Sequence, residues 1–387
     1  MKARPSRKRD WRKKSKMSCK QVYFIGTLPA KGKTPFGGGE VGNLRTVRML
    51  ESFGYRVRTI RRYRSQASET RLQVWVMYPL RFLANVLACF TVLLLGKRRG
   101  SVVHVSGFYG PTIPIETVQV FLAKSLGYRL VYEMRGGGAQ HYYENLRNGY
   151  RWQFRRIVRK ADGILSQGKE NEALLKSLCD TPVYHYPNAV SADFYPALRP
   201  EKPADRVNLL FYGRIEVEKN PLLIVEAASL LQRQFDNVTL TLIGSGQREL
   251  TARLREKMEA ELAPGSFRFE PGCAHEALPP LLADKHFYLF PSRQLREGQS
   301  NALTEAMSFG IVPIASPQGF NRSTVGDDAL IVETLSAEAY AEAVARILRE
   351  GAFERYSEQV YARFCDLFTE EAVFARMRKV YDEILPL

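Results

Sequence analysis

Short apolar runs alternate along the chain with longer stretches in which apolar residues recur every three or four positions. Runs bounded by turn residues predict buried strands, and the longer stretches predict helices. The strands predicted in the first half are residues 21–26, 55–60, 102–105, 130–134, 163–166 and 183–186. Strands separated by helices are typical of a parallel, doubly wound sheet covered on both faces.

The second half repeats this alternation after residues 197–206, whose two prolines and mixed charge predict an interdomain linker. Its predicted strands are residues 209–212, 239–243, 267–269, 286–290, 311–315 and 329–332, and its last predicted helices are residues 337–349, 353–364 and 370–385. A chain of 387 residues suits two α/β domains rather than one core. We therefore predict two Rossmann-like, doubly wound domains.

The formal net charge of +17 is concentrated at the N-terminus, where the first twenty residues hold ten Lys and Arg against Asp10. Such a run predicts a disordered tail over residues 1–20, which could dock on anionic lipid or bind nucleic acid. Met17 is an alternative start that would remove most of this tail. The segment lacks the apolar stretch of a signal peptide.

The five cysteines are scattered without metal-ligand spacing, which indicates reduced thiols in a cytoplasmic protein. The most membrane-like segment is residues 82–95, followed by Lys97, Arg98 and Arg99. Fourteen residues are too few to span a bilayer, which takes about 20. This segment is predicted as a buried core helix, with a helix lying on the membrane surface as the alternative.

Candidate chemistry lies between the predicted strand 286–290 and a predicted helix at 302–308. This loop is at the carboxyl end of a strand, where open α/β sheets bind ligands. It carries Glu297, and Glu305 follows in the helix. A carboxylate accepts several hydroxyl hydrogen bonds, as recognition of a sugar or ribose requires. The alternative is structural, with Glu305 near a helix dipole and Glu297 in solvent.

Residues 296–301 and 304–310 together resemble the E-x7-E motif of the family 4 retaining glycosyltransferases, which have the GT-B fold. The resemblance implies that Glu297 contacts the donor sugar and that Glu305 binds the ribose hydroxyls. It also implies that backbone amides of the intervening loop hold the diphosphate. Those loop residues are Gly298, Gln299, Ser300 and Asn301.

A second motif, from Gly213 to Asn220, places Arg214 and Lys219 at the turn after the predicted strand 209–212. Paired cations there suit a diphosphate leaving group, and the alternative is a surface ion-pair cluster with nearby glutamates. The segment resembles the family's G-R-x-x-x-x-K-N motif, whose Arg and Lys bind the diphosphate. Gly244 ends the next strand, at the family's nucleotide edge. The loop 272–275 is expected to run toward the same site.

Gly37, Gly39 and Gly42 satisfy G-x-G-x-x-G, which alone favours a dinucleotide fold weakly. The glycines begin too far after the first predicted strand for that fingerprint. Arg61 and Arg62, rather than an acidic residue, stand at the end of the second predicted strand, so only an NADP-binding variant of the dinucleotide fold would fit. We predict a glycine-rich loop over residues 37–43. The resemblance implies that Gly38 and Gly39 approach the donor phosphate.

One departure from the family concerns the residues after the strand 130–134, where many relatives carry a His that contacts the donor sugar. Here Arg135 holds that place. A related subgroup has E-x-R, so Glu133 and Arg135 are candidate sugar or acceptor contacts, and a structural salt bridge is the alternative. His141 is a further candidate.

Residues 186–196 resemble the family's P-N-G-V-D passage, with Ala189 and Ser191 in place of Gly and Asp. The resemblance implies an acceptor domain over residues 21–198, a donor domain over 199–369 and a last helix, 370–387, that packs back on the first. The two domains would face a central cleft.

We therefore expect a retaining glycosyltransferase with Glu297, Arg214 and Lys219 in catalytic roles. Its donor would be a UDP- or GDP-sugar, and no metal or other cofactor is expected. A glycan or lipid-linked acceptor would fit bacterial lipopolysaccharide, capsule or exopolysaccharide synthesis on the cytoplasmic face of the inner membrane. The alternatives are a soluble acceptor, a GT-B isomerase of nucleotide sugars, an NADP-dependent reductase or, on charge alone, a nucleic-acid-binding module.

Overall fold

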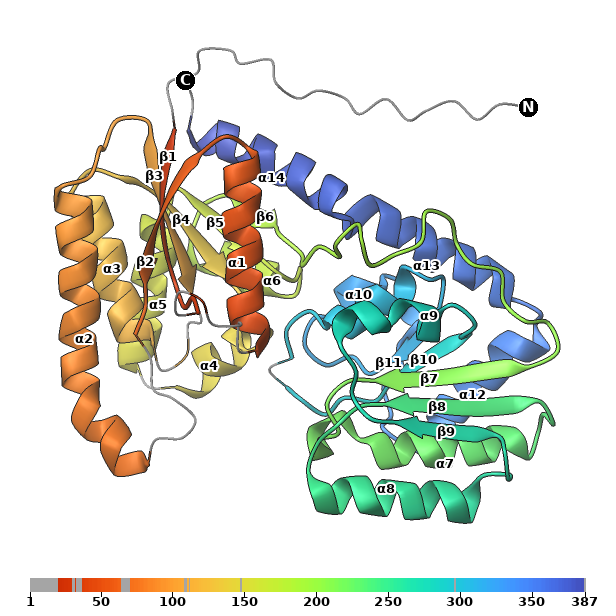
Figure 1. Cartoon of the computed structure of the whole chain (residues 1–387). Helices are drawn as coiled ribbons and strands as arrows, with labels where there is room; N and C mark the ends of the chain where they lie inside the picture. The colour runs from red at the N-terminus through yellow and green to blue at the C-terminus, as the bar shows by residue number, and fades with distance from the viewer. Residues whose placement is uncertain are drawn as a thin grey trace, which may run out of the picture.

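Two parallel β-sheets, each covered by helices, follow one another along the chain (Figure 1). The computed structural model describes residues 20–29, 32, 37–63, 70–107, 110, 112–146, 148–295 and 297–385. The predicted tail up to residue 19 lies outside the described residues, as does Arg296.

The first sheet has six parallel strands in the order β2-β1-β3-β4-β5-β6. The strands are β1 Gln21–Gly26, β2 Arg56–Arg61, β3 Ser101–Gly107, β4 Arg129–Met134, β5 Gly163–Ser166 and β6 Val183–His185. The helices between and after them are α1 Gly37–Ser52, α2 Arg71–Leu94, α3 Ile113–Ser125, α4 Ala139–Asn145, α5 Asn148–Lys160 and α6 Asn171–Leu178. β3 is buried throughout, which fits its three valines, although Ser101, His104 and Ser106 interrupt the apolar run.

The second sheet has five parallel strands in the order β11-β10-β7-β8-β9. They are β7 Val207–Tyr212, β8 Val238–Ile243, β9 Phe267–Glu270, β10 Phe287–Phe290 and β11 Val312–Ala315. The helices of this half are α7 Pro221–Gln232, α8 Arg248–Glu261, α9 Pro279–Leu282, α10 Asn301–Met307, α11 Asn321–Val325, α12 Ala337–Arg349, α13 Phe353–Leu367 and α14 Glu370–Ile384. The two sheets confirm the predicted two-domain α/β class.

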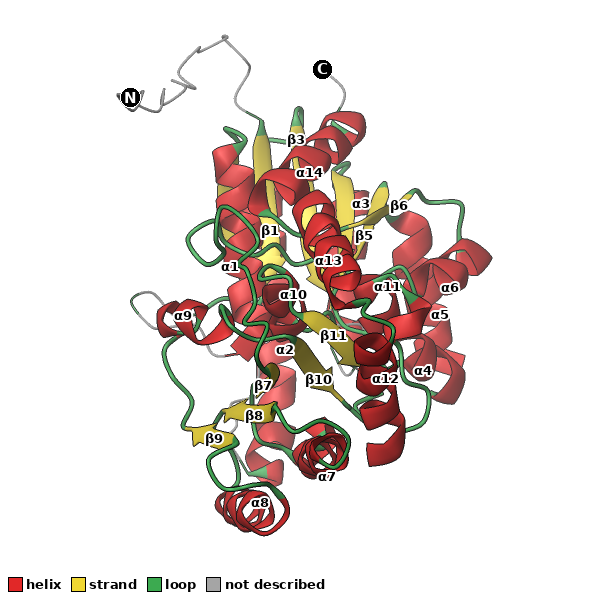
Figure 2. Ribbon diagram, turned by 90° about the vertical axis from the view of Figure 1, so that its right-hand side faces the viewer, coloured by secondary structure: helices red, strands yellow, loops and turns green. Residues whose placement is uncertain are grey.

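The last helix, α14, leaves the second domain and packs on the first (Figures 1 and 2). Thr369 caps it by accepting a hydrogen bond from the Ala372 amide. Its apolar face, including Met377 and Tyr381, shares a core with strand residues such as Phe24. The polypeptide thus crosses twice between the domains, once before β7 and once before α14.

Two predicted elements are wrong in detail. Residues 329–332 do not form a strand, because the 3-10 turn Asp328–Leu330 includes the first two of them and only Ile331 bridges to Ala315. Residues 37–43 do not form a loop, because α1 begins at Gly37. Gly42 allows this helix to approach the end of β4 closely, since a Cβ atom there would lie 1.9 Å from a guanidinium nitrogen of Arg135.

The apolar segment at 82–95 is also not the predicted buried helix. It is the second half of α2, which is 24 residues long and is exposed over most of its surface. Its buried residues are Asn85, Cys89 and Leu93, a stripe at every fourth position. Among the described residues, α2 is the single helix long and apolar enough to cross a membrane by length and composition.

Candidate functional site at the domain interface

Two glycines form the floor of the candidate site at the carboxyl ends of β7 and β8. Gly213 has φ of +146°, a conformation that residues with a side chain rarely adopt. Gly244 lies against it, and a Cβ atom on Gly244 would be 2.0 Å from the Gly213 carbonyl oxygen. The structure therefore brings these two predicted donor-binding residues together, with Gly213 exposed and Gly244 buried beneath it.

Glu297 lies at this same edge in an ion pair with Lys219. The Lys219 ammonium contacts Oε2 of Glu297, and the Ser292 hydroxyl donates to the same oxygen at 3.2 Å. Lys219 also stands 4.8 Å from the centre of the Phe290 ring, a cation–π contact. Both charged side chains are largely buried. The predicted carboxylate and cation are thus direct neighbours.

Arg214 does not join that pair. Its side chain is 75% exposed, and its guanidinium contacts Glu216 at 2.7 Å. This is the surface ion pair given above as the alternative. Exposed pairs contribute only about 0 to 1 kcal/mol to stability, so the guanidinium is free to exchange Glu216 for a ligand.

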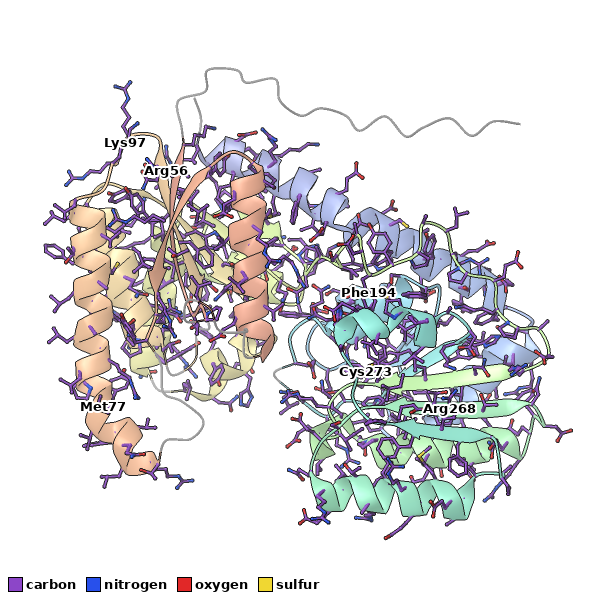
Figure 3. The ribbon with its side chains drawn as sticks, in the orientation of Figure 1. Arg56, Met77, Lys97, Phe194, Arg268 and Cys273 are labelled. Carbon is purple, nitrogen blue, oxygen red and sulfur yellow. The ribbon has the colours of Figure 1, made fainter. Side chains whose placement is uncertain are left out.

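Glu305 lies in the second turn of α10 and is held by two polar partners. The Tyr212 hydroxyl donates to Oε2 at 3.0 Å, and His275 Nε2 contacts Oε1 at 3.0 Å. His275 stacks on Phe194 at 4.4 Å between ring centres, and Figure 3 labels Phe194 and the neighbouring Cys273. The hydrogen bond to Glu305 raises the pKa of His275. Each carboxylate oxygen keeps a lone pair for a further donor.

The loop before α10 is fastened to the first domain by side-chain amides. The Gln299 side chain accepts a hydrogen bond from the backbone N–H of Asn188 at 2.6 Å and donates one to the backbone carbonyl of Asn188 at 3.2 Å. Asn188 also donates to Asn301 at 2.9 Å and accepts from Gln167 at the same distance. Gln167 in turn accepts from the backbone amides of Gly136 and Gln299. This network joins the predicted loop to β5, to the residues after β4 and to the predicted P-N passage.

Of two further predicted loop residues, Gly298 is close to the first domain and Ser300 begins α10. Gly298 lies beside Gly136, and a Cβ atom on Gly298 would be 2.9 Å from the Gln167 side-chain oxygen. Ser300 is the N-cap residue of α10, and its side chain makes no capping hydrogen bond.

Glu133 and Arg135 form a buried ion pair at the end of β4, as the structural alternative predicted. Glu133 also contacts His104 at 2.7 Å, and His104 contacts the Tyr381 hydroxyl of α14. Burial by itself raises the pKa of Glu133, but the Arg135 charge and the His104 hydrogen bond outweigh it and hold this pKa below its usual value. Arg135 further donates to Thr46 at 2.8 Å. The chain of contacts leads from α14 to the domain interface.

The remaining predicted residues are less central. Gly38 and Gly39 lie in the first turn of α1, so they form a helix start rather than a loop around a ligand. His141 is exposed on α4, and its side chain contacts Tyr142 and Asn145 of the same helix.

Several residues of the interface have no assigned role in the sequence analysis: Arg45, Gln167, Asn188, Tyr212 and His275. Arg45 projects from α1, and burial lowers the pKa of its guanidinium, as does Arg135, whereas Glu305 raises it. It is therefore a further cation of this interface, beside Lys219 and Arg135. Two features of the sequence could have indicated these residues. Asn188 lies in the P-N passage, and His275 lies in the loop 272–275, which was expected to run toward the site.

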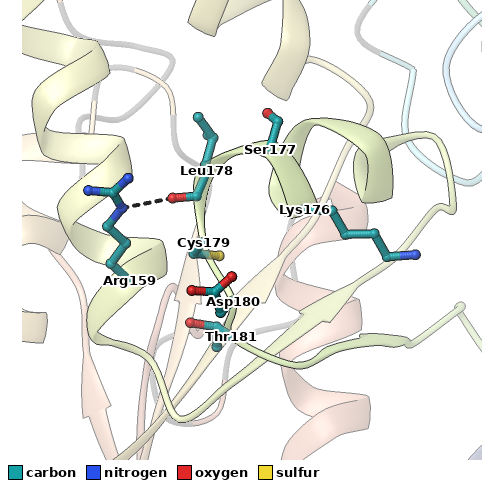
Figure 4. Close-up of a pocket in the computed structure, with 7 residues that line it drawn as sticks. All are labelled: Arg159, Lys176, Ser177, Leu178, Cys179, Asp180 and Thr181. Atoms are coloured by element: carbon teal, nitrogen blue, oxygen red, sulfur yellow. Dashed lines mark hydrogen bonds between the residues drawn. The ribbon is translucent and has the colours of Figure 1, made fainter.

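A hollow of about 480 Å³ lies elsewhere, between the carboxyl ends of α5 and α6 (Figure 4). Its lining residues are Arg159, Lys176, Ser177, Leu178, Cys179, Asp180 and Thr181. Arg159 donates to the Leu178 carbonyl at 2.7 Å. These residues precede β5 and β6, so the hollow is at the sheet edge opposite to the candidate site. Within the described residues, three or more His, Cys, Asp or Glu side chains do not gather closely enough to hold a metal.

Comparison with known proteins agrees with this geometry. Residues 198–363 match the model of the family "Glycosyl transferases group 1", and this segment contains Arg214, Lys219, Glu297 and Glu305. The match supports a glycosyltransferase. A curated relative, a subunit of the phosphatidylinositol N-acetylglucosaminyltransferase of Arabidopsis thaliana, is 26% identical over 219 residues. The aligned part is 56% of this chain and 47% of the relative, so it spans about half of that protein.

Solved structures establish the fold as GT-B. A glycosyltransferase from Rickettsia africae ESF-5 superposes with a TM-score of 0.71 and 16% identity, covering 96% of this chain and 100% of that one. The pneumococcal O-GlcNAc transferase GtfA, solved with UDP and GlcNAc, superposes with a TM-score of 0.59 and 19% identity. That alignment covers 79% of this chain and 60% of GtfA.

Proposed function

We propose that this protein is a family 4 retaining glycosyltransferase that moves a sugar from a UDP-sugar to a lipid-linked acceptor. The observation that carries the proposal is the convergence of Glu297, Lys219 and Glu305 over the glycine floor, opposite the first domain. All three lie in the segment that matches the glycosyltransferase family model.

Each group has a role that its environment suits. Glu305 would accept the ribose hydroxyls, because Tyr212 and His275 fix its carboxylate while lone pairs remain. Glu297 would accept hydroxyls of the transferred sugar. Lys219, already beside Glu297, would turn its ammonium toward the diphosphate.

Departure of the nucleoside diphosphate places negative charge on its leaving oxygen. Lys219 and Arg214 would stabilise this charge, and such electrostatic stabilisation is often worth about 100-fold or more in rate. The E-x7-E resemblance supports a front-face attack by the acceptor hydroxyl with the leaving phosphate as base. Arg45 and Arg135 would supply further positive charge from the first domain. These side chains could supply the charge that a metal ion provides elsewhere, and we propose metal independence.

UDP-N-acetylglucosamine is the first donor to test, because the name of the curated relative and the ligands of GtfA both include N-acetylglucosamine. A lipid-linked acceptor is supported by the relative's name, which includes phosphatidylinositol, and by the exposed apolar surface of α2. We also propose a cytoplasmic, peripheral membrane location. Lipopolysaccharide, capsule or exopolysaccharide synthesis remains the setting predicted from the sequence.

The test is release of the nucleoside diphosphate from a panel of UDP- and GDP-sugars, with and without EDTA. Turnover of one donor, lost in Glu297→Ala and Glu305→Ala and unchanged by EDTA, is expected. Glu259→Ala is the matched control, since it removes an exposed helical carboxylate of the same domain. Turnover that both variants retain would place the chemistry elsewhere, and loss of activity in EDTA would contradict metal independence.

A further inference from the structure

Helix α2 presents an apolar surface that no described element covers. A surface helix normally carries polar residues on its outer face. Here the exposed residues are mostly large and apolar: Leu72, Trp75, Val76, Met77, Tyr78, Leu80, Leu83, Leu87, Phe90 and Leu94. Trp75 is 82% exposed and Leu72 is 74% exposed. Apolar surface gathered in this way marks an interaction site.

Among the described residues, the contacts that anchor α2 to the domain lie in its second half. Asn85 holds it by accepting from the Tyr63 amide at 2.8 Å and donating to the Tyr63 carbonyl at 3.0 Å. The first turns lie beyond Pro79, which lacks an N–H and bends a helix. Figure 1 shows the bend, and Figure 3 shows Met77 in the projecting part. We call residues 71–78 the α2 tip.

Positive charge surrounds this apolar surface. Between residues 52 and 115 the sequence contains ten Lys and Arg and one acidic residue, Glu69; of these cations Arg62 is buried, whereas Arg61 and Arg71, the residue that begins α2, are exposed. Arg56 and Arg58 share a sheet face with Ile60, which belongs to the same core cluster as Cys89 of α2. Lys97, Arg98 and Arg99 follow the helix and line, with Lys20 and Arg129, a basic hollow of about 550 Å³. Figure 3 labels Arg56 and Lys97 at this end.

This combination fits an anionic lipid bilayer. An apolar helix inserts its side chains below the headgroups, and basic residues near the surface add electrostatic attraction to anionic lipid. A second copy of the chain fits less well, because the same basic border would face itself. The charge around α2 therefore favours a membrane over self-association.

The helix is long enough to cross a bilayer, but its connections favour an orientation along the surface. Its two ends lead to β2 and β3, and both strands hydrogen-bond to β1. Crossing would place strands of one sheet on opposite sides of the membrane. Lying flat, 24 residues cover about 36 Å of the interface.

We propose that α2 is the membrane-docking surface of this protein and lies in the interface of an anionic bilayer. The α2 tip follows the carboxyl end of β2, the same sheet edge at which β4 leads to Arg135. An acceptor anchored in the bilayer would thus approach the same edge of the sheet as the candidate site. This role rests on the proposed function, because it supplies the lipid-linked acceptor of that reaction.

The test is cosedimentation of the full chain with vesicles of phosphatidylcholine alone and with about 30% phosphatidylglycerol, at low and high salt. We expect binding to the anionic vesicles. High salt should weaken this binding but not abolish it, because the apolar contacts of α2 are not screened. The double variant Leu72→Glu with Trp75→Glu should lower the partition coefficient by at least about tenfold. The control variant Leu198→Glu with Leu295→Glu changes two other exposed leucines and should bind as the parent does.

Tryptophan emission gives a second measurement that needs no charged substitution. Anionic vesicles should shift the emission to shorter wavelength, and Trp75→Phe but not Trp152→Phe should remove the shift. The proposal is overturned if the parent does not bind, if the tip variant binds equally well, or if the tip variant only converts a dimer to a monomer. UDP binding by the tip variant separates this result from the proposed function, since it should be unchanged.

Discussion

Gly137 offers a steric test of the domain interface. A Cβ atom built on this residue would lie 2.2 Å from the Glu297 carbonyl oxygen and 2.9 Å from Cα of Gly319. Carbon–oxygen contacts are normally about 3.3 Å or longer, so Gly137→Ala forces the loop that carries Glu297 away by about 1 Å. The φ angle of Gly137 lies outside the left-handed region, so the added methyl acts through this contact.

A displacement of about 1 Å in a catalytic site lowers the rate by about 100-fold. We therefore expect kcat/KM of Gly137→Ala for donor turnover to fall by about that factor, with the melting temperature little changed because each domain keeps its own core. Gly149→Ala is the control, since a Cβ atom there would meet nothing within 4 Å. Activity of Gly137→Ala equal to that of the control would refute the proposed role of this contact.

Three other predictions concern individual side chains. Tyr212→Phe removes the hydroxyl that fixes Glu305 and should weaken UDP binding by about tenfold in calorimetry, because hydrogen bonds to charged groups contribute about 1.5 to 3 kcal/mol. Glu133→Gln leaves Arg135 buried without its partner and should lower the free energy of unfolding by about 3 to 5 kcal/mol in urea titrations. Because the pKa of Glu133 is lowered on folding, that stabilisation is present above about pH 4.5 and is lost as the pH falls further, so the variant should show a shallower acid dependence. Glu305→Gln should return the pKa of His275 toward 6.5 in an NMR titration, and an unchanged pKa would argue against the contact. In the parent protein, the raised pKa of His275 stabilises the fold below pH 6.5. This contribution disappears as the pH rises through the pKa of the folded state.

The alternation of strands and helices was visible in the sequence because buried parallel strands are continuous apolar runs. The segment 297–305 was visible because its residues are contiguous. The partners of Glu305 were not, since Tyr212 is 93 positions away in the chain and His275 is 30 away. Such contacts depend on the order of strands in the sheet, which the sequence pattern does not state.

Local signals misled in two places. Three successive glycines predict a loop because each costs a helix about 1 kcal/mol, yet α1 begins at Gly37 and Gly42 is packed against Arg135. In α2, the uncharged apolar run begins only after Arg81, so the sequence pattern placed the start at residue 82. The true start has a capping box, in which Thr70 accepts from the Gln73 amide and the Gln73 side chain accepts from the Thr70 amide.

The most direct test of the account is calorimetric titration of the protein with UDP and UDP-N-acetylglucosamine, followed by the other UDP- and GDP-sugars. We expect saturable binding of one nucleotide sugar, weakened at least about tenfold in Glu305→Gln, because an amide replaces the carboxylate proposed to accept the ribose hydroxyls. Failure of every nucleotide sugar to bind, or equal binding by Glu305→Gln, would contradict a donor site at this domain interface.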